Sequence, residues 1–184
     1  KTSLMFSLAA CASRPVCLTT TTKIAREEGS RAANHILFVD FSLSSIDQLR
    51  LEKLTLVTNG LNPSGDKWLG LSYPEISQLF QNCQQGDTLL IIEADGARRL
   101  PLKAPAEYEP VIPDWVSLVI VVVGLSAIGK TLDEEHVFRP ERFSEVSGLA
   151  LGELVRLEHI LKMLTHPDGG LKEIPSGCKA IIVF

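Results

Sequence analysis

The sequence predicts a three-layer α/β/α protein built on a mostly parallel sheet. Apolar segments typical of strands alternate along the chain with segments of helical periodicity, an order that places helices on both faces of a parallel sheet. Two apolar segments, 88–92 and 116–123, are nearly uninterrupted, as expected for strands buried on both faces. A chain of 184 residues, 45% of them hydrophobic, can bury a core without disulfides or metals. We therefore expect a single domain over residues 1–184.

The first half of the chain supplies most of the predicted elements. Leu4, Leu8 and Cys11 recur at helical spacing, so the opening segment is expected to be a helix over about residues 2–12. The elements expected next are strands at 15–18, 35–41 and 54–57, a short helix at 45–53, a helix at 73–84 and the strand at 88–92.

The second half begins with a loop. Four prolines lie between positions 101 and 113, which predicts an ordered connection rather than a helix or a central strand. The elements expected after it are the strand at 116–123, an amphipathic helix at 149–164 and a closing strand at 179–184.

Composition argues against several classes of protein. The net charge of −4 does not suit a nucleic-acid-binding face, which needs clustered cations. Four scattered cysteines without a C-x-x-C pair predict reduced thiols in a cytoplasmic protein and no zinc site. The apolar run at 116–123 is too short to span a membrane. A small anionic ligand remains compatible with this charge, because one loop of backbone amides can hold a phosphate.

The sequence opens with Lys1, Thr2 and Ser3 at the start of the first predicted helix. A phosphate-binding P-loop ends in this way: its lysine contacts the phosphates and the next hydroxyl binds magnesium. On this interpretation the loop glycines and the first strand lie upstream, and the sequence is an internal stretch of a longer protein. The alternative is a helix that begins with these residues by chance.

Glu93 and Asp95 follow the predicted strand at 88–92. Ligands bind at the carboxyl edge of open α/β sheets, and a carboxylate there can hold magnesium directly or through water. We therefore take both residues as candidate catalytic and metal-binding groups, with Gly96 in the adjoining turn. The alternative is a strand cap in which Asp95 bonds local amides.

Thr20, Thr21, Thr22 and Lys23 follow the predicted strand at 15–18 and are expected at the same edge of the sheet. Buried hydroxyls would each need a hydrogen-bond partner. Facing a polyphosphate, the threonines would donate to its oxygens and the lysine would add positive charge. The alternative is a solvated edge or loop.

Three further sequence patterns are candidates for binding an anion or a phosphate. Arg98 and Lys103 are candidate clamps for an anionic ligand, although a rigid surface connection would carry the same charges. His136 and Arg139 would share one face if their segment were helical. A literal P-loop motif at 124–131 also follows a predicted strand, but Pro140 cuts short the helix it requires and three carboxylates would crowd the phosphates.

Taken together, these segments resemble the YqeC family. The matching pieces are K-T-S-L at 1–4, L-T-T-T-T-K-I at 18–24 and I-E-A-D-G-A-R at 92–98, followed in the family's order by 102–105, 109–113, 123–125, 139–141 and 166–167. They cover nearly the whole chain. The resemblance implies a P-loop NTPase-like fold with its phosphate loop ending at Lys1, and it suggests that the motif at 124–131 is a coincidence.

The resemblance also implies a function. Members of this family are expected to bind ATP or GTP with Mg²⁺ and to serve as accessory factors in the maturation of selenium-dependent molybdenum hydroxylases. The implied partners are the nucleotide and a molybdenum hydroxylase or its cofactor-maturation proteins. Two alternatives stay open: a non-hydrolysing carrier of a selenium species or molybdenum cofactor, and a kinase-like small-molecule transferase.

Overall fold

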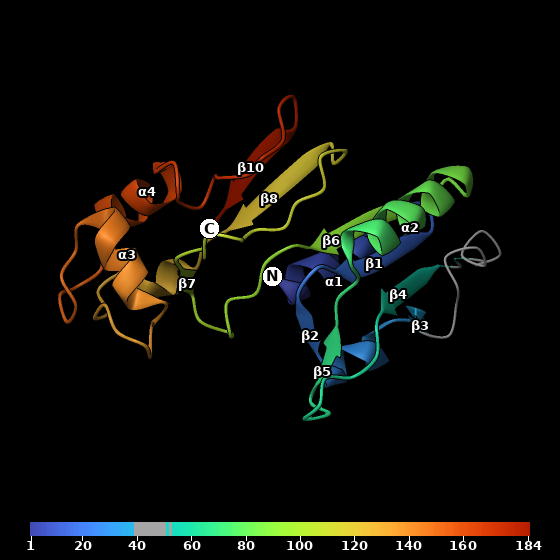
Figure 1. The fold of residues 1–184 in the computed structure, drawn as a ribbon, viewed down its shortest axis with the longest axis horizontal. Helices are drawn as coiled ribbons and strands as arrows, with labels where there is room; N and C mark the ends of the chain where they lie inside the picture. The colour runs from blue at the N-terminus through green and yellow to red at the C-terminus, as the bar shows by residue number, and fades with distance from the viewer. Residues whose placement is uncertain (39–50, 52) are drawn as a thin grey trace. The chain divides into compact units, whose positions relative to one another are not determined.

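The computed structural model describes residues 1–38, 51 and 53–184. The chain divides into two compact units, unit 1 at Lys1–Gly96 and unit 2 at Ala97–Phe184 (Figure 1). Each unit contains its own buried apolar cluster. The single-domain organisation expected from the sequence stays a prediction.

Unit 1 is built on a four-stranded parallel sheet with the strand order β3-β4-β1-β6. Its strands are β1 (Val16–Thr20), β3 (Asn34–Leu37), β4 (Leu54–Thr58) and β6 (Leu89–Glu93). The inner strand β1 is buried along its whole length. Because all four strands run in the same direction, their carboxyl ends meet at one edge of the sheet.

Helices cover both faces of this sheet. Met5 of α1 (Thr2–Ala10) packs in the cluster that contains Val16 and Leu18 of β1. The intervening residue Cys17 instead contacts Cys83 of α2 (Tyr73–Gln85). Successive side chains of a strand point to opposite faces, so α1 and α2 form the two outer layers. This confirms the α/β/α arrangement predicted from the sequence.

Local chemistry sets the start of α2. Ser72 and Glu75 form a capping box, in which the Ser72 amide donates to the Glu75 carboxylate at 2.6 Å, and Pro74 occupies the first turn. Both features satisfy or remove amide donors that a helix start leaves unpaired. The helix ends next to Gly86, which confirms the predicted helix at 73–84 to within one residue.

Three short elements complete unit 1. β2 (Lys23–Ala25) pairs antiparallel with β5 (Lys67–Leu69), and the 3-10 helix η1 (Arg26–Arg31) follows β2. The predicted helix at 45–53 and the end of the predicted strand at 35–41 fall largely outside the described residues.

Unit 2 carries two pairs of parallel strands and two short helices. β8 (Leu118–Val122) pairs with β10 (Lys179–Val183), and the two lie side by side in Figure 1. The other pair is β7 (Leu102–Lys103) with β9 (Val137–Phe138). α3 (Pro140–Ser147) and α4 (Leu157–Thr165) pack in a cluster around the fully buried Phe143.

Three sequence expectations need correction. The strand predicted at 15–18 continues through Thr20, so two of the threonines lie inside the sheet. β6 and β8 are partly exposed rather than buried on both faces. The helix predicted at 149–164 begins only at Leu157, because residues 149–156 form turns. There Gly152 has a φ of +82°, and the Leu132 amide donates to the Glu153 carbonyl, so backbone pairing with another segment replaces helical bonds.

Within the described part of the chain, no helix is both long enough and apolar enough to cross a membrane.

Candidate functional site

The carboxyl edge of the unit 1 sheet brings together residues more than ninety positions apart. Thr20 and Glu93 are paired at the ends of β1 and β6. The hydroxyl of Thr2, in the first turn of α1, donates to the Glu93 carboxylate at 2.7 Å, and the Lys1 ammonium pairs with Asp95 at 2.5 Å. The opening lysine and threonine and the two carboxylates therefore form one cluster, as their positions in the sequence predicted.

Burial makes Glu93 an unusual carboxylate. Desolvation raises its pKa above the usual value, and the hydrogen bond from Thr2 and the positive charge at Lys1 only partly oppose this. The nearby charge of Glu28 raises the pKa further. A buried carboxylate of this kind gains from a cation, because the cation offsets the cost of holding its negative charge away from water.

The first turn of α1 contributes the amide donors that a helix start leaves without a partner inside the helix. Ser3 is exposed in this turn, and its carbonyl accepts from the Ser7 hydroxyl at 3.0 Å. The positive end of the helix dipole adds to these donors. This end of α1 has the elements of an anion site next to a carboxylate pair, which is the arrangement needed for a phosphate with its metal.

The threonine segment divides into a buried and an accessible part. The Thr20 hydroxyl is buried, donates to the Glu93 carbonyl at 2.8 Å and accepts from the Thr22 amide at 3.0 Å. The Thr21 amide donates to the same carbonyl at 3.1 Å. Thr22 lies beside Gly96, where an added Cβ would be 3.6 Å from the threonine hydroxyl. Thr20 thus fixes the turn, while Thr21 and Thr22 are only half-buried; Lys23 is exposed at the start of β2.

Sequence reasoning missed two residues of this site. Gly70 donates its amide to the Thr22 carbonyl at 2.7 Å, and a Cβ at this position would lie 2.5 Å from the Thr20 carbonyl oxygen. A glycine is therefore required for the chain to pass over the threonine turn. The second missed residue is Glu28 of η1, whose charge raises the pKa of Glu93. Glu28 is paired with Arg31 at 2.6 Å. Neither has a local sequence signal, because both act through packing between distant segments.

The oxygen donors of Thr2, Glu93 and Asp95 suit a magnesium ion, which prefers hard ligands and keeps several waters or phosphate oxygens in its shell. Among the described residues, no group of three or more His, Cys, Asp or Glu side chains is placed to hold a metal. A magnesium ion at this edge would take its remaining oxygens from water or phosphate.

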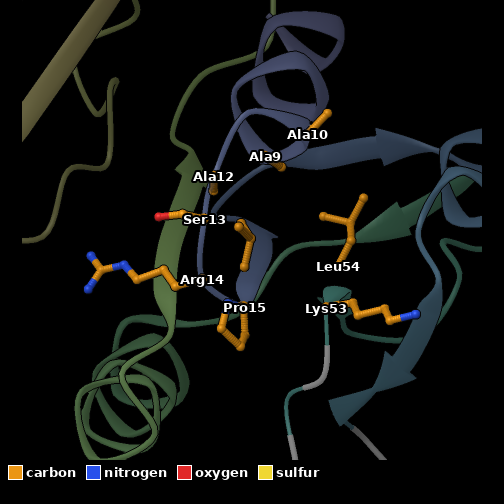
Figure 2. Close-up of a pocket in the computed structure, with 9 residues that line it drawn as sticks. Ala9, Ala10, Ala12, Ser13, Arg14, Pro15, Lys53 and Leu54 are labelled. Atoms are coloured by element: carbon orange, nitrogen blue, oxygen red, sulfur yellow. The ribbon is translucent and has the colours of Figure 1, made fainter.

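A pocket of about 400 Å³ lies at the opposite edge of the sheet. It is lined by the last turn of α1 and by the residues that lead into β1 and β4, where the Arg14 and Lys53 side chains extend in opposite directions (Figure 2). Arg14 is paired with Asp87 at 2.8 Å. Most of the residues that line the pocket are apolar, and none of the predicted site residues is among them.

Arg98 and Lys103 lie in unit 2, close to Arg139. Their charged groups and that of Arg139 surround the ring of Phe138. Lys103 and Arg139 each pair with Glu109 at 2.6 Å. Arg139 caps the start of α3, so it does not share a helical face with His136 as expected.

Glu109 is held ionised by its partners. Burial alone would raise its pKa, but hydrogen bonds from Arg139, Lys103 and the Ala106 amide lower the pKa from the usual 4.5 to about 2. The stabilising effect of a lowered carboxylate pKa is present above the usual value and is lost as the pH falls toward the folded value.

We expect the substitution Glu109→Gln to lower the free energy of unfolding by about 2 kcal/mol at pH 7, after allowing for partial solvent screening. Between pH 4.5 and 2 the wild type should lose this advantage and the difference between the two should shrink. Urea unfolding across this pH range measures the effect. Glu107→Gln, at an exposed neighbour, is the matched control, and an equal loss in both variants would contradict the prediction.

The internal P-loop motif does not have the conformation of a phosphate loop. The amides of Ile128, Gly129 and Lys130 donate to carbonyls within unit 2, and the Thr131 hydroxyl donates to the Asp133 carboxylate. A phosphate loop needs these amides to point at the ligand. No helix follows the motif before α3, which agrees with the expectation that it is a coincidence.

Comparison with known proteins decides the family. The family model described as YqeC protein matches residues 1–141. The chain belongs to the YqeC family. The match includes the whole cluster at the carboxyl edge of unit 1 and extends through Arg139 in unit 2.

The chain is also similar to a curated relative, the uncharacterized protein YqeC of Escherichia coli (strain K12). The two are 38% identical over 93 residues, a region that covers 50% of this chain and 36% of the relative. The chain therefore matches about a third of the length of that protein. No solved structure matches this chain.

Proposed function

We propose that this YqeC-family chain binds ATP or GTP with Mg²⁺ at the carboxyl edge of the unit 1 sheet. The observation that carries the proposal is the hydrogen bond between the Thr2 hydroxyl and the Glu93 carboxylate. It joins the start of a helix that follows Lys1 to the end of a parallel strand, and these are the two groups that share the magnesium ion in P-loop proteins.

The residues of the cluster have separate roles in this proposal. Lys1 exchanges its ion pair with Asp95 for the terminal phosphates of the nucleotide. Thr2 and Glu93 hold the metal, and Asp95 holds it through water or orients a water molecule. The Thr21–Thr22 turn contacts the phosphates and moves with them, so that binding energy separates two states of the protein.

The biological role that we propose is that of an accessory factor in the maturation of selenium-dependent molybdenum hydroxylases. It is supported by membership of the YqeC family and by the sequence motifs that carry the resemblance. The partner is then a molybdenum hydroxylase or one of its cofactor-maturation proteins. Nucleotide hydrolysis, where it occurs, should be slow until the partner supplies a missing group.

Thr2→Val tests the metal role of the hydroxyl while keeping the side-chain shape. We expect calorimetry on the full-length protein to show MgATP or MgGTP binding about tenfold weaker than in the wild type, because one metal ligand is lost. In EDTA, the two proteins should bind nucleotide equally.

The matched control is Ser7→Ala, which removes a hydroxyl that bonds within the same helix. Its affinity should be that of the wild type. If Thr2→Val binds MgATP and MgGTP as tightly as the wild type does, Thr2 is not a ligand of the metal. Absence of nucleotide binding by the wild type would overturn the function and favour the carrier alternative.

A further inference from the structure

Three cations of unit 2 converge on one aromatic ring. The charged groups of Arg98, Lys103 and Arg139 lie 4.6, 5.6 and 4.3 Å from the centre of the Phe138 ring. Lys103 and Arg139 both pair with the Glu109 carboxylate. The three positive charges lie close together in a partly desolvated position, where like charges repel strongly.

The backbone also places two of these arginines at a cost. Arg98 has a φ of +50° and Arg139 a φ of +64°, in the left-handed region that favours glycine. Each such residue is strained, because its Cβ lies too close to the following carbonyl oxygen. Both strained positions direct a guanidinium group to the same ring. Strain and like-charge repulsion therefore act at one place, which is typical of a site that awaits a ligand of opposite charge.

The cluster has a fixed part and an accessible part. The Lys103 side chain is only 5% exposed and pairs with Glu109. Arg139 donates two bonds to the Glu109 carboxylate and one to the Ala104 carbonyl, which leaves two of its five N–H groups without an acceptor in the described chain. Arg98 is exposed and makes no hydrogen bond or ion pair with any described residue beyond its contact with the ring.

We propose that Arg98 and Arg139 form an oxyanion site in unit 2 that binds a phosphate group. Planar guanidinium forks match the oxygens of a phosphate, and the negative charge of a phosphate would offset the repulsion between the two guanidinium groups. Phe138 is the platform on which the two forks lie, and the Lys103–Glu109 pair holds Arg139 in place. The site is separate from the nucleotide cluster of unit 1, and its ligand is inorganic phosphate or a phosphate monoester.

Calorimetry tests the site with two probes, inorganic phosphate and phenyl phosphate, titrated into the full-length protein at constant ionic strength against a chloride control. Arg98→Gln should weaken binding of the preferred probe at least fivefold, and Arg98→Lys, which keeps the charge but not the fork, should restore it in part. Lys130→Gln, at an exposed lysine outside the cluster, should leave binding unchanged.

The two probes identify the source of the phosphate: tighter binding of phenyl phosphate indicates a phosphorylated substrate, and tighter or equal binding of inorganic phosphate indicates a site for the free anion. The site is overturned by equal affinity in the wild type and Arg98→Gln, or by no binding to the wild type. Lys1→Ala separates the two proposals. Loss of phosphate binding in that variant alone would place the anion in unit 1 and leave the nucleotide function standing.

Discussion

The substitution Lys1→Ala is expected to weaken binding of MgATP or MgGTP by about 100-fold. A hydrogen bond from a charged donor contributes roughly 1.5–3 kcal/mol, and 100-fold corresponds to about 2.7 kcal/mol. In the ligand-free protein the lysine is paired with Asp95 at 2.5 Å. Its removal therefore has two effects: the phosphates lose a cation, and Asp95 is left to repel them.

A double-mutant cycle separates these two effects. If repulsion by Asp95 dominates, Asp95→Ala should restore most of the affinity lost in Lys1→Ala. If the phosphate contact dominates, the double variant should stay as weak as Lys1→Ala. Calorimetry on the full-length proteins measures both.

Lys130→Ala is the matched control, because Lys130 is the lysine of the internal P-loop motif and is exposed. Its amide is bonded to the Ala127 carbonyl, so we expect wild-type affinity for nucleotide. Loss of binding in Lys130→Ala with normal binding in Lys1→Ala would move the site to unit 2 and reject the assignment of the opening residues.

The candidate site could be predicted from the sequence where its residues end regular elements. Glu93 and Asp95 follow an apolar strand, and Lys1 and Thr2 begin a periodic helix, so parallel topology is enough to place them at one edge. Gly70 could not be found in this way. Its role depends on how its segment crosses the threonine turn, and this contact is set by the pairing of β2 with β5 rather than by any local pattern.

The errors have similar causes. Apolar residues at 149–156 have helical spacing, but this segment forms backbone hydrogen bonds with residues 130 and 132, and turns replace the helix. Burial of β8 on both faces was inferred from its apolar sequence, whereas the strand pairs with β10 alone in a two-stranded sheet. Arg139 looked like a helical neighbour of His136 because a left-handed residue between a strand and a helix leaves no periodic signal.

Glu93→Gln should change stability and binding in opposite directions. Because burial raises the pKa of Glu93, the folded protein holds a proton more tightly than the unfolded chain does. At pH 7 the ionised carboxylate therefore destabilises the fold, and the penalty disappears as the pH falls below the usual pKa. Glutamine is neutral and its oxygen can still accept from Thr2. The variant should be more stable than the wild type by roughly 1 kcal/mol at pH 7 and equally stable at pH 4.

The same substitution removes a charged metal ligand, so Mg²⁺-dependent nucleotide binding should fall by about 100-fold. Urea unfolding without metal or nucleotide gives the stability, and calorimetry with both gives the affinity. Glu134→Gln, at an exposed carboxylate in unit 2, should change neither. A variant that is less stable than the wild type at pH 7 would show that the Thr2 and Lys1 interactions outweigh the cost of burial. A buried carboxylate that serves to bind a cation should show a gain in stability together with a loss of binding when it is replaced by glutamine. Unchanged nucleotide affinity would therefore show that Glu93 is not a ligand of the metal.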